Sequence, residues 1–471
     1  MSLVLVALAL PLLAAVLALC WRRQAARLVW LAALLNLPLL AVALWQVVTS
    51  GSQPLLLSST ETELLHWQLT PLTALLMLLV ASIHFLVASY SLSQWRFAGL
   101  SLYFWPLAAL VQSLFFVLLL SADLLFWYLS MELLGLVAVA LVLLAGKKAW
   151  QAALRYLLLS LAGSLSFLLG VALLYSQYGS FALSELTLGI AASSADPRLA
   201  LWLMTLGLML KAALWPLHWW LPAAHLVAPT AVSALHAGLI IKAPLFLLWM
   251  LWSQLATPAI AEVGSVWFLL TGSLALLAGG WSALRAPLPK LMIAHSTVAQ
   301  LGYGLLALGL MLSLAEPSLE QAFWLFIMAH ALAKAAAFLA IGEMQLRLGG
   351  KRLTTFRGAS QTMPLAMFAL AVAGGSLIGL PPSGGFLAKW QLLVPLWQQS
   401  QYWPVLLVIL LGTLLSAGYV FRLVVLAFYR ARPRPAGFKA PVLPQWLALM
   451  PALLVWCLAL FSLPLLHWLG G

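Results

Sequence analysis

The sequence predicts an all-α polytopic membrane protein. Of its 471 residues, 65% are hydrophobic and only 7% are charged, whereas soluble proteins carry about 25% charged residues. Apolar runs of about 20 residues recur along the whole chain, and each is long enough to cross the hydrocarbon core of a bilayer as a helix. The mean hydropathy is +1.08. These observations exclude a soluble globular domain.

About fourteen transmembrane helices are expected, one for each apolar segment. The segments lie near residues 2–21, 28–48, 71–93, 102–120, 124–144, 153–176, 199–219, 229–252, 265–284, 292–313, 321–345, 362–397, 403–428 and 443–467. The first lacks the charged leader and the cleavage site of a signal peptide, so we expect a mature helix there. The twelfth is too long for one straight span and contains GLPPSGG (379–385), which predicts a break.

The placement of charge predicts the orientation. With the N-terminus outside, eighteen basic residues fall in the inner connections and Arg198 alone falls in the outer ones, which is a strong positive-inside bias. The inner residues are Arg22, Arg23, Arg27, Arg96, Lys147, Lys148, Arg155, Arg285, Lys290, Arg347, Lys351, Arg352, Arg357, Arg422, Arg430, Arg432, Arg434 and Lys439. The outer acids are Glu61, Glu63, Asp123, Glu185, Asp196, Glu262, Glu316 and Glu320. We therefore expect both termini on the outer side of a bacterial or archaeal cytoplasmic membrane.

The net charge of +13 is, on this placement, mostly a signal of topology, and no nucleic-acid partner is expected. The basic inner face predicts binding of anionic lipids such as cardiolipin. The chain has two cysteines, Cys20 and Cys457, and neither a CxxC nor a GxGxxG motif. We therefore expect no metal site and no cofactor held by this chain.

Five charged residues lie where no connection can hold them: Glu132, Lys211, Lys242, Lys334 and Lys389. At about 1.5 Å per helical residue, the first four lie near mid-membrane, and Lys389 follows the break in segment twelve. A charge there costs at least about 2.5–3.5 kcal/mol, so ionisable residues inside a membrane indicate an ion or proton pathway. Burial disfavours the charged form of a lysine, whereas a nearby carboxylate favours it. A change in the distance between a buried lysine and a glutamate would therefore change the proton affinity of the lysine, so such a pair can act as a proton switch. The alternative is that the lysines snorkel or hold helices together.

Prolines interrupt the helices beside these charges. Pro216 and Pro244 each remove an amide donor close to a lysine, and Pro381 and Pro382 lie within the predicted break before Lys389. Irregular backbone at membrane depth persists only against protein or a wet cavity, and transporters commonly build sites at broken helices. A hydrated site at each break is the prediction.

Histidines lie near the same positions and are candidate proton carriers, because imidazole exchanges protons near neutral pH. They are His236, His295 and His330. His330 and Lys334 are four residues apart and share one helix face. Packing through ordinary hydrogen bonds is the alternative for each histidine. Glu343 is expected at the membrane interface.

Several stretches together resemble the antiporter-like subunits of respiratory complex I, Mrp-type cation/proton antiporters and membrane-bound hydrogenases. They are FWYLSMELLGL (126–136), KAALWPLHWWLPAAHLVAPTAVSALHAGLIIKA (211–243), residues 292–304, HALAKAAAFLAIG (330–342) and GLPPSGGFLAKW (379–390). The resemblance covers nearly the whole chain. It implies fourteen helices, with two inverted five-helix repeats whose helices seven and twelve are broken.

The resemblance implies a division into residues 1–101 with helices one to three, 102–252 with the first repeat, 265–428 with the second repeat, and 443–471 with helix fourteen. It implies that Glu132 and Lys211 are the switching pair and that His236 and Lys242 lead to the second half. Lys334 with His330 would continue the relay, and Lys389 would be the terminal site. Partners would be other membrane subunits, including homologous antiporter-like ones.

Three positions depart from the family pattern. Ala223 stands where relatives usually carry Asp, which removes an acid from the inner mouth; His295 stands where they usually carry Tyr; and the terminal site is Lys389 instead of Glu. No long lateral helix is expected after the fourteenth segment.

The function predicted is proton translocation by an antiporter-like subunit of a multisubunit membrane complex. Lysines repel Na⁺ and no cluster of membrane carboxylates offers oxygen ligands, so H⁺ is the expected ion. The alternatives are a stand-alone antiporter, a proton-conducting subunit of an inorganic-carbon uptake complex and a non-conducting scaffold subunit.

Overall fold

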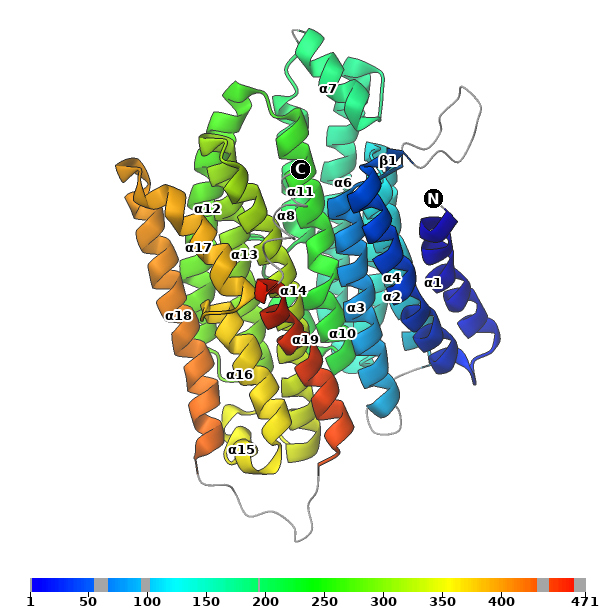
Figure 1. The fold of residues 1–471 in the computed structure, drawn as a ribbon, viewed down its shortest axis with the longest axis vertical. Coiled ribbons are helices and arrows are strands. Elements are labelled where there is room, and N and C mark those ends of the chain that lie inside the picture. The colour runs from blue at the N-terminus through cyan, green and yellow to red at the C-terminus, as the bar shows by residue number, and fades with distance from the viewer. Residues whose placement is uncertain (1, 55–66, 95–101, 194, 430–439, 461–471) are drawn as a thin grey trace. The chain divides into compact units, whose positions relative to one another are not determined.

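The computed structural model of the chain describes residues 2–54, 67–94, 102–193, 195–429 and 440–460. These residues are almost entirely helical (Figure 1). The helices are α1 (Ser2–Cys20), α2 (Ala25–Ser50), α3 (Pro71–Gln94), α4 (Phe104–Leu120), α5 (Leu124–Leu143), α6 (Trp150–Tyr178), α7 (Leu183–Ala192), α8 (Arg198–Lys211), α9 (Trp220–Val227), α10 (Thr230–Gly238), α11 (Ala243–Leu255), α12 (Pro258–Arg285), α13 (Pro289–Leu314), α14 (Pro317–Leu348), α15 (Ala359–Thr362), α16 (Pro364–Ile378), α17 (Gly384–Trp397), α18 (Trp403–Phe428) and α19 (Val442–Leu460). The two-residue strands β1 (Gln53–Pro54) and β2 (Gln68–Leu69) pair antiparallel, with Gln53 opposite Leu69.

The predicted class, an all-α polytopic membrane protein, is confirmed. Among the described residues, eleven helical stretches are long and apolar enough to cross a membrane, and α4, α7 and α16 are shorter apolar helices. Helix α7 is not among the predicted segments. It has only ten residues, about half of what a span needs, so hydropathy does not identify it as a transmembrane segment.

The predicted breaks in segments seven and twelve are confirmed. Segment seven divides into α8, which ends at Lys211, and α9, which begins at Trp220. Segment twelve divides into α16 and α17 around the proline pair. Segment eight is also interrupted, by a 3₁₀ turn over Ile240–Lys242 between α10 and α11. Pro244 lies in the first turn of α11, where a missing amide costs no intrahelical hydrogen bond.

Several helices begin or end beyond the predicted segments. Arg27, Lys290 and Arg347, expected in connections, lie in helices that extend beyond the predicted segments. Arg155 and Arg422, also expected in connections, lie within helices as well. Long basic side chains reach outward from the last turns of a helix, so hydropathy alone underestimates helix length. Some of the charged residues used to predict the orientation lie outside the described residues. They are Glu61, Glu63, Arg96, Arg430, Arg432, Arg434 and Lys439.

Packing divides the chain into two compact units. The first comprises residues 1–85, 101–213 and 240–263, and the second comprises residues 86–100, 214–239 and 264–471. In the first unit α6 packs closely along α8. A Cβ atom added to Gly163 would lie 2.8 Å from the Gly207 carbonyl oxygen, and one added to Gly207 would lie 2.4 Å from the Gly163 carbonyl oxygen. Small residues permit this close approach, as in other membrane helix pairs.

Helix α14 forms the centre of the second unit. The most apolar 18 consecutive residues of α14 are entirely buried. Helices α10, α13, α16, α17 and α19 pack against α14 (Figure 1). Buried positions on several sides explain why α14 is apolar all round. His330 and Lys334 are therefore carried into the interior of this unit.

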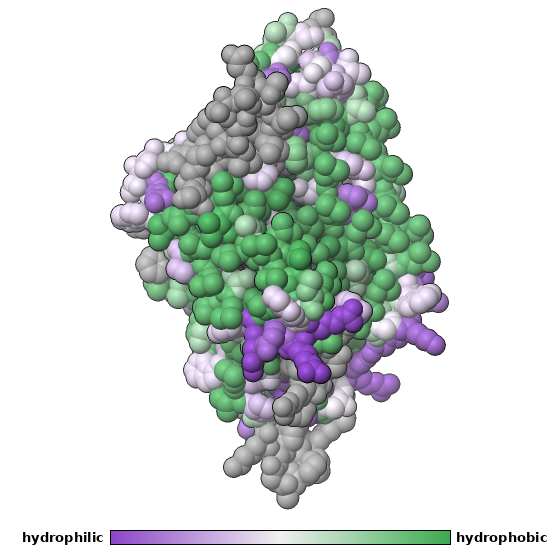
Figure 2. Space-filling model, turned by 90° about the vertical axis from the view of Figure 1, so that its right-hand side faces the viewer, coloured by the Kyte–Doolittle hydropathy of each residue, from purple (hydrophilic) through white to green (hydrophobic). Residues whose placement is uncertain are grey.

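The outward faces of the spanning helices are apolar. On α6, the exposed side chains include Leu154, Leu158, Leu165 and Leu169. Figure 2 shows a broad hydrophobic surface on the face it draws, with hydrophilic residues gathered beyond its edge. An exposed apolar surface of this kind is stable against lipid but not against water.

The break between α16 and α17 depends on a glycine. A Cβ atom on Gly385 would lie 2.1 Å from the Ser376 carbonyl oxygen, which is backbone and cannot move aside easily. We therefore expect Gly385→Ala to destabilise the protein by about 1–3 kcal/mol, measured as a lower midpoint of thermal unfolding in detergent. Gly304→Ala is the matched control, because the nearest atoms to its Cβ would be 3.8 Å away. Equal midpoints for the two variants would contradict the close approach.

Candidate functional site

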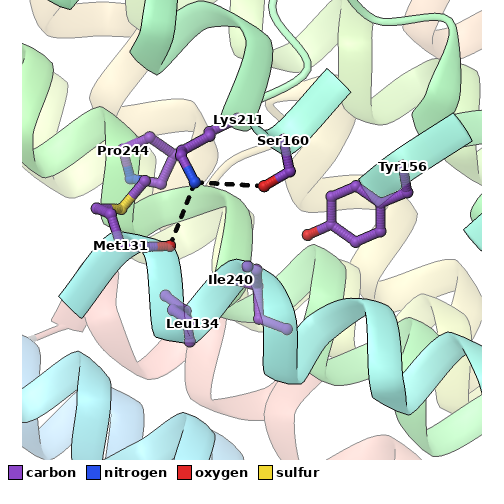
Figure 3. A pocket seen from close by; sticks show the side chains of 8 residues that line it. Met131, Leu134, Tyr156, Ser160, Lys211, Ile240 and Pro244 are labelled. Atoms are coloured by element: carbon purple, nitrogen blue, oxygen red, sulfur yellow. Dashed lines mark hydrogen bonds between the residues drawn. The ribbon is translucent and has the colours of Figure 1, made fainter. Parts of the chain in front are cut away.

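Lys211 is the centre of a polar site in the first unit. It is the last residue of α8, and it is 7% exposed. Its ammonium donates to the Ser160 hydroxyl at 3.3 Å and to the Met131 carbonyl at 3.4 Å (Figure 3). Because α8 ends here, the side chain lies where the backbone turns away from the helix.

Glu132 completes this site from α5. Its Oε2 atom lies 3.3 Å from the Lys211 Nζ atom, and the Ser164 hydroxyl donates to the same oxygen. The Glu132 side chain is 19% exposed and that of Lys211 is 6% exposed. The structure thus brings together the two residues expected to form the switching pair, in a geometry that stabilises both charges.

A small cavity adjoins Lys211. Its lining includes Ser160 and Tyr156 from α6, with Ile240 and Pro244 from the interrupted segment eight (Figure 3). The Ser160 and Tyr156 hydroxyls offer hydrogen-bonding partners to a small molecule such as water. The irregular backbone around Ile240 therefore lies against a cavity at this depth, as expected for a broken helix.

Lys242 ends the 3₁₀ turn that precedes α11 and is 5% exposed. His236 lies on α10 and is 2% exposed. Its ring centre lies 6.0 Å from that of Trp220 and 5.8 Å from that of His225. Lys242 belongs to the first unit and His236 to the second.

Lys334 is fully buried in the second unit. Its ammonium donates to the Ser296 hydroxyl at 2.5 Å and to the Ile293 carbonyl at 3.1 Å, both on α13. One turn earlier on α14, His330 stacks on Phe326 with 5.7 Å between the ring centres. His295, the neighbour of Ser296, is half-buried and interacts electrostatically with His218.

Lys389 lies on α17, directly after the break, and is 4% exposed. Its ammonium donates to the carbonyls of Leu377 and Ile378, at 2.8 and 3.0 Å. These carbonyls lie at the end of α16, where no following turn supplies amide donors. The ammonium also lies 4.2 Å from the centre of the Tyr303 ring, within range of a cation–π interaction. The broken helix itself therefore provides the acceptors for this lysine.

Glu343, expected at the membrane interface, lies inside the protein. Its side chain is fully buried and accepts hydrogen bonds from Tyr90 at 3.1 Å, Gln94 at 2.5 Å and Arg347 at 3.0 Å. Arg347 also donates to the Gln94 side chain at 2.7 Å, which closes a ring of polar contacts between α3 and α14. The sequence does not predict this ring, because two of the partners of Glu343, Tyr90 and Gln94, are uncharged and distant in the chain.

Other polar residues at the site were also not predicted. Lys290, expected in an inner connection, is 7% exposed and donates to the Ala228 carbonyl at 2.6 Å. His225 is buried and stacks on Phe338 of α14. The hydroxyls of Ser160 and Ser164 contact the charged pair, yet serine is common in membrane helices and carries no positional signal by itself.

Comparison with known proteins agrees with this architecture. Residues 121–416 match the family model described as NADH:quinone oxidoreductase/Mrp antiporter, transmembrane region. NADH-quinone oxidoreductase subunit N of Geotalea uraniireducens is 31% identical over 361 residues, 74% of this chain and 74% of that protein. The corresponding subunit N of Desulforudis audaxviator is 33% identical over 334 residues. That alignment covers 69% of this chain but only 64% of the relative.

Solved structures share the fold over nearly the whole chain. A chain of the membrane-bound sulfane sulfur reductase, an archaeal respiratory membrane complex, has a TM-score of 0.88 at 24% identity and covers 100% of this chain and 96% of its own. A chain of the Mrp complex from Dietzia sp. has a TM-score of 0.88 at 21% identity, with 100% and 97% coverage. The family match spans more than half of the sequence, so the chain belongs to the NADH:quinone oxidoreductase/Mrp antiporter transmembrane family, whose members are antiporter-like membrane subunits.

Proposed function

We propose that this chain translocates protons as a subunit of a multisubunit membrane complex. The proton-transfer residues in this proposal are Glu132, Lys211, His236, Lys242, His295, His330, Lys334 and Lys389. The chain moves H⁺ along these side chains, and the energy comes from partner subunits or from an opposing ion gradient.

The observation that carries the proposal is the Lys211–Glu132 pair at 3.3 Å between Nζ and Oε2. The pair is placed where α8 ends and where a small cavity adjoins Lys211. A carboxylate close to an ammonium favours the charged form, and separation of the two favours release of the proton. A movement of α8 against α5 would therefore change the proton affinity of Lys211, which is how the pair would couple to its partners.

Lys334→Met tests the proposal in the second unit. The purified complex is reconstituted into liposomes, a potassium diffusion potential is imposed, and proton flux is followed with a pH-sensitive dye inside. We expect flux to fall about tenfold or more, because the ammonium that contacts Ser296 and Ile293 is a proton carrier in this proposal. Lys351→Met, which removes an exposed lysine, should leave flux unchanged.

The same measurement separates the remaining alternatives. A non-conducting scaffold subunit predicts equal flux in the wild type and in Lys334→Met. A stand-alone antiporter predicts that the isolated chain in liposomes exchanges a cation for protons without partners. A subunit of an inorganic-carbon uptake complex predicts that the other subunits of such a complex co-purify with it.

The setting we propose is a bacterial or archaeal cytoplasmic membrane with both termini outside, because the basic residues favour this orientation. The partners are other membrane subunits, including homologous antiporter-like ones. Three similar structures come from multisubunit assemblies, among them respiratory complex I from Thermus thermophilus, with a TM-score of 0.76 at 24% identity. The exposed inner residues Arg22, Arg23 and Arg27 would bind anionic lipid headgroups.

A further inference from the structure

We propose that the Tyr419 hydroxyl, on α18, passes protons between Lys334 and Lys389, and that Gln300 is the positioning residue that holds it. The inference rests on the proposed function, because it requires protons to move between these two lysines. It adds α18 and two uncharged proton carriers, Ser296 and Tyr419, to a pathway otherwise made of lysine, glutamate and histidine, with Gln300 as a positioning residue beside them. All of these residues lie in the second unit.

The first part of the connection runs from Lys334 to Tyr419. The Lys334 ammonium lies 2.5 Å from the Ser296 hydroxyl. That hydroxyl donates to the Ile293 carbonyl at 2.9 Å and lies close to the Tyr419 hydroxyl. Both Ser296 and Tyr419 are fully buried. Hydroxyl groups both donate and accept, so this row of three polar groups is able to pass a proton along.

Gln300 fixes the position of Tyr419. The amide nitrogen of Gln300 lies 3.2 Å from the Tyr419 hydroxyl and 3.1 Å from the Ser416 hydroxyl. Tyr419 itself donates to Ser416 at 3.2 Å. A buried tyrosine held by two hydrogen-bonding partners has a defined hydroxyl position. An amide cannot readily carry a proton, so Gln300 orients the relay without belonging to it.

Gln300 also reaches the Lys389 end of the connection. Its amide nitrogen donates to the Leu377 carbonyl at 3.1 Å, and the Lys389 ammonium donates to that same carbonyl at 2.8 Å. One side chain on α13 therefore contacts both the tyrosine and the acceptor that holds the terminal lysine. This shared carbonyl places Lys389 beside the relay.

A small pocket lies beside this connection. Its lining includes Ile293, whose carbonyl accepts from Lys334, and Leu377, whose carbonyl accepts from Lys389, with Tyr419 as a further lining residue. The Gln300 Oε1 atom is buried and accepts no hydrogen bond from any residue the structure describes. Buried amide oxygens are normally satisfied. We therefore place the water molecule of the last step at the Gln300 amide, which contacts both the Tyr419 hydroxyl and the carbonyl that holds Lys389.

The transfer conserves every atom and charge. The Ser296 hydroxyl first turns from the Ile293 carbonyl toward Tyr419, and the Lys334 ammonium then gives a proton to the Ser296 oxygen as the Ser296 hydroxyl proton passes to Tyr419. Tyr419 receives that proton and releases its own hydroxyl proton to the water. The water gives a proton to the neutral amine of Lys389, so Lys334 ends as an amine and Lys389 as an ammonium. Rotation of the hydroxyls then resets the row.

Tyr419→Phe tests the relay in the reconstituted complex under an imposed potassium diffusion potential. It removes one oxygen and keeps the ring, and we expect proton flux to fall about tenfold. Tyr178→Phe is the matched control, since Tyr178 donates to the Ala195 carbonyl within the other unit. Wild-type flux in Tyr419→Phe would overturn the relay. Should that variant fail to assemble, Ser296→Ala removes the neighbouring hydroxyl and must lower flux too.

Gln300→Leu distinguishes positioning from a general packing role. If Gln300 acts through the tyrosine, Gln300→Leu combined with Tyr419→Phe should be no slower than Tyr419→Phe alone, whereas independent packing losses would add. Additive losses would overturn the positioning role. Lys334→Met separates the relay from the proposed function. Proton flux that is lost in Lys334→Met but kept in Tyr419→Phe rejects only the relay. Flux kept in both rejects the proposed function.

Discussion

Replacement of Lys211 by methionine is expected to lower proton flux through the reconstituted complex by at least about 100-fold. The ammonium is the only group of that side chain able to carry a proton, and it contacts Glu132, Ser160 and the Met131 carbonyl. Methionine fills a similar volume, so the close packing of α6 on α8 should be kept. The measurement is dye-reported flux under an imposed potassium diffusion potential, at equal amounts of assembled complex.

The matched control for Lys211→Met removes a cation from an exposed ion pair. The Arg198 Nε atom lies 3.7 Å from the Asp196 Oδ2 atom, and the two side chains are 53% and 59% exposed. Such pairs contribute about 0–1 kcal/mol, and Arg198→Gln should leave flux and unfolding unchanged. Flux that persists in Lys211→Met would remove the central element of the proposed mechanism.

Glu343→Gln is expected to destabilise the protein by about 3–5 kcal/mol, the cost of breaking a buried charge pair by removing one partner. The fully buried carboxylate accepts from Tyr90, Gln94 and Arg347. An amide in its place has one acceptor oxygen and presents new donors to groups that are themselves donors. The guanidinium of Arg347 would then lose its counter-charge inside the protein.

The midpoint of chemical or thermal unfolding in detergent measures this effect. Glu185→Gln is the control, because Glu185 is exposed on α7 and the same chemical change there should cost little. Equal midpoints for the two variants would mean that the polar ring between α3 and α14 contributes nothing to stability. A midpoint much lower in Glu343→Gln than in Glu185→Gln would establish that Glu343 stabilises the fold.

The sequence predicted most of the helical architecture because a membrane limits the choices available to a chain. A spanning segment must satisfy its backbone hydrogen bonds within itself, so each apolar run of about 20 residues specifies a helix. The same constraint made Lys211, Lys334 and Lys389 conspicuous, because a charge inside such a run is costly. The prolines and glycines of residues 379–385 likewise predicted the break before Lys389, because their effect on a helix is local and does not depend on neighbouring helices.

The polar partners of these lysines could not be predicted in the same way. Ser296 and Tyr419 lie on different helices, and nothing in their own segments distinguishes them from ordinary serine and tyrosine. Glu343 looked interfacial because it lies near a helix end, whereas packing of α3 against α14 buries it. Helix α7 was missed because a ten-residue helix outside the spans has no periodic apolar signal of sufficient length.

The sequence by itself determined which segments are helices, where they break and which charges must find partners, because each of these follows from local hydropathy and backbone hydrogen bonding. The tertiary structure decided which side chains supply those partners. Close helix crossings, such as the approach of Gly163 to Gly207, set which faces meet. That choice depends on the fit of side chains far apart in the chain, and no local pattern encodes it.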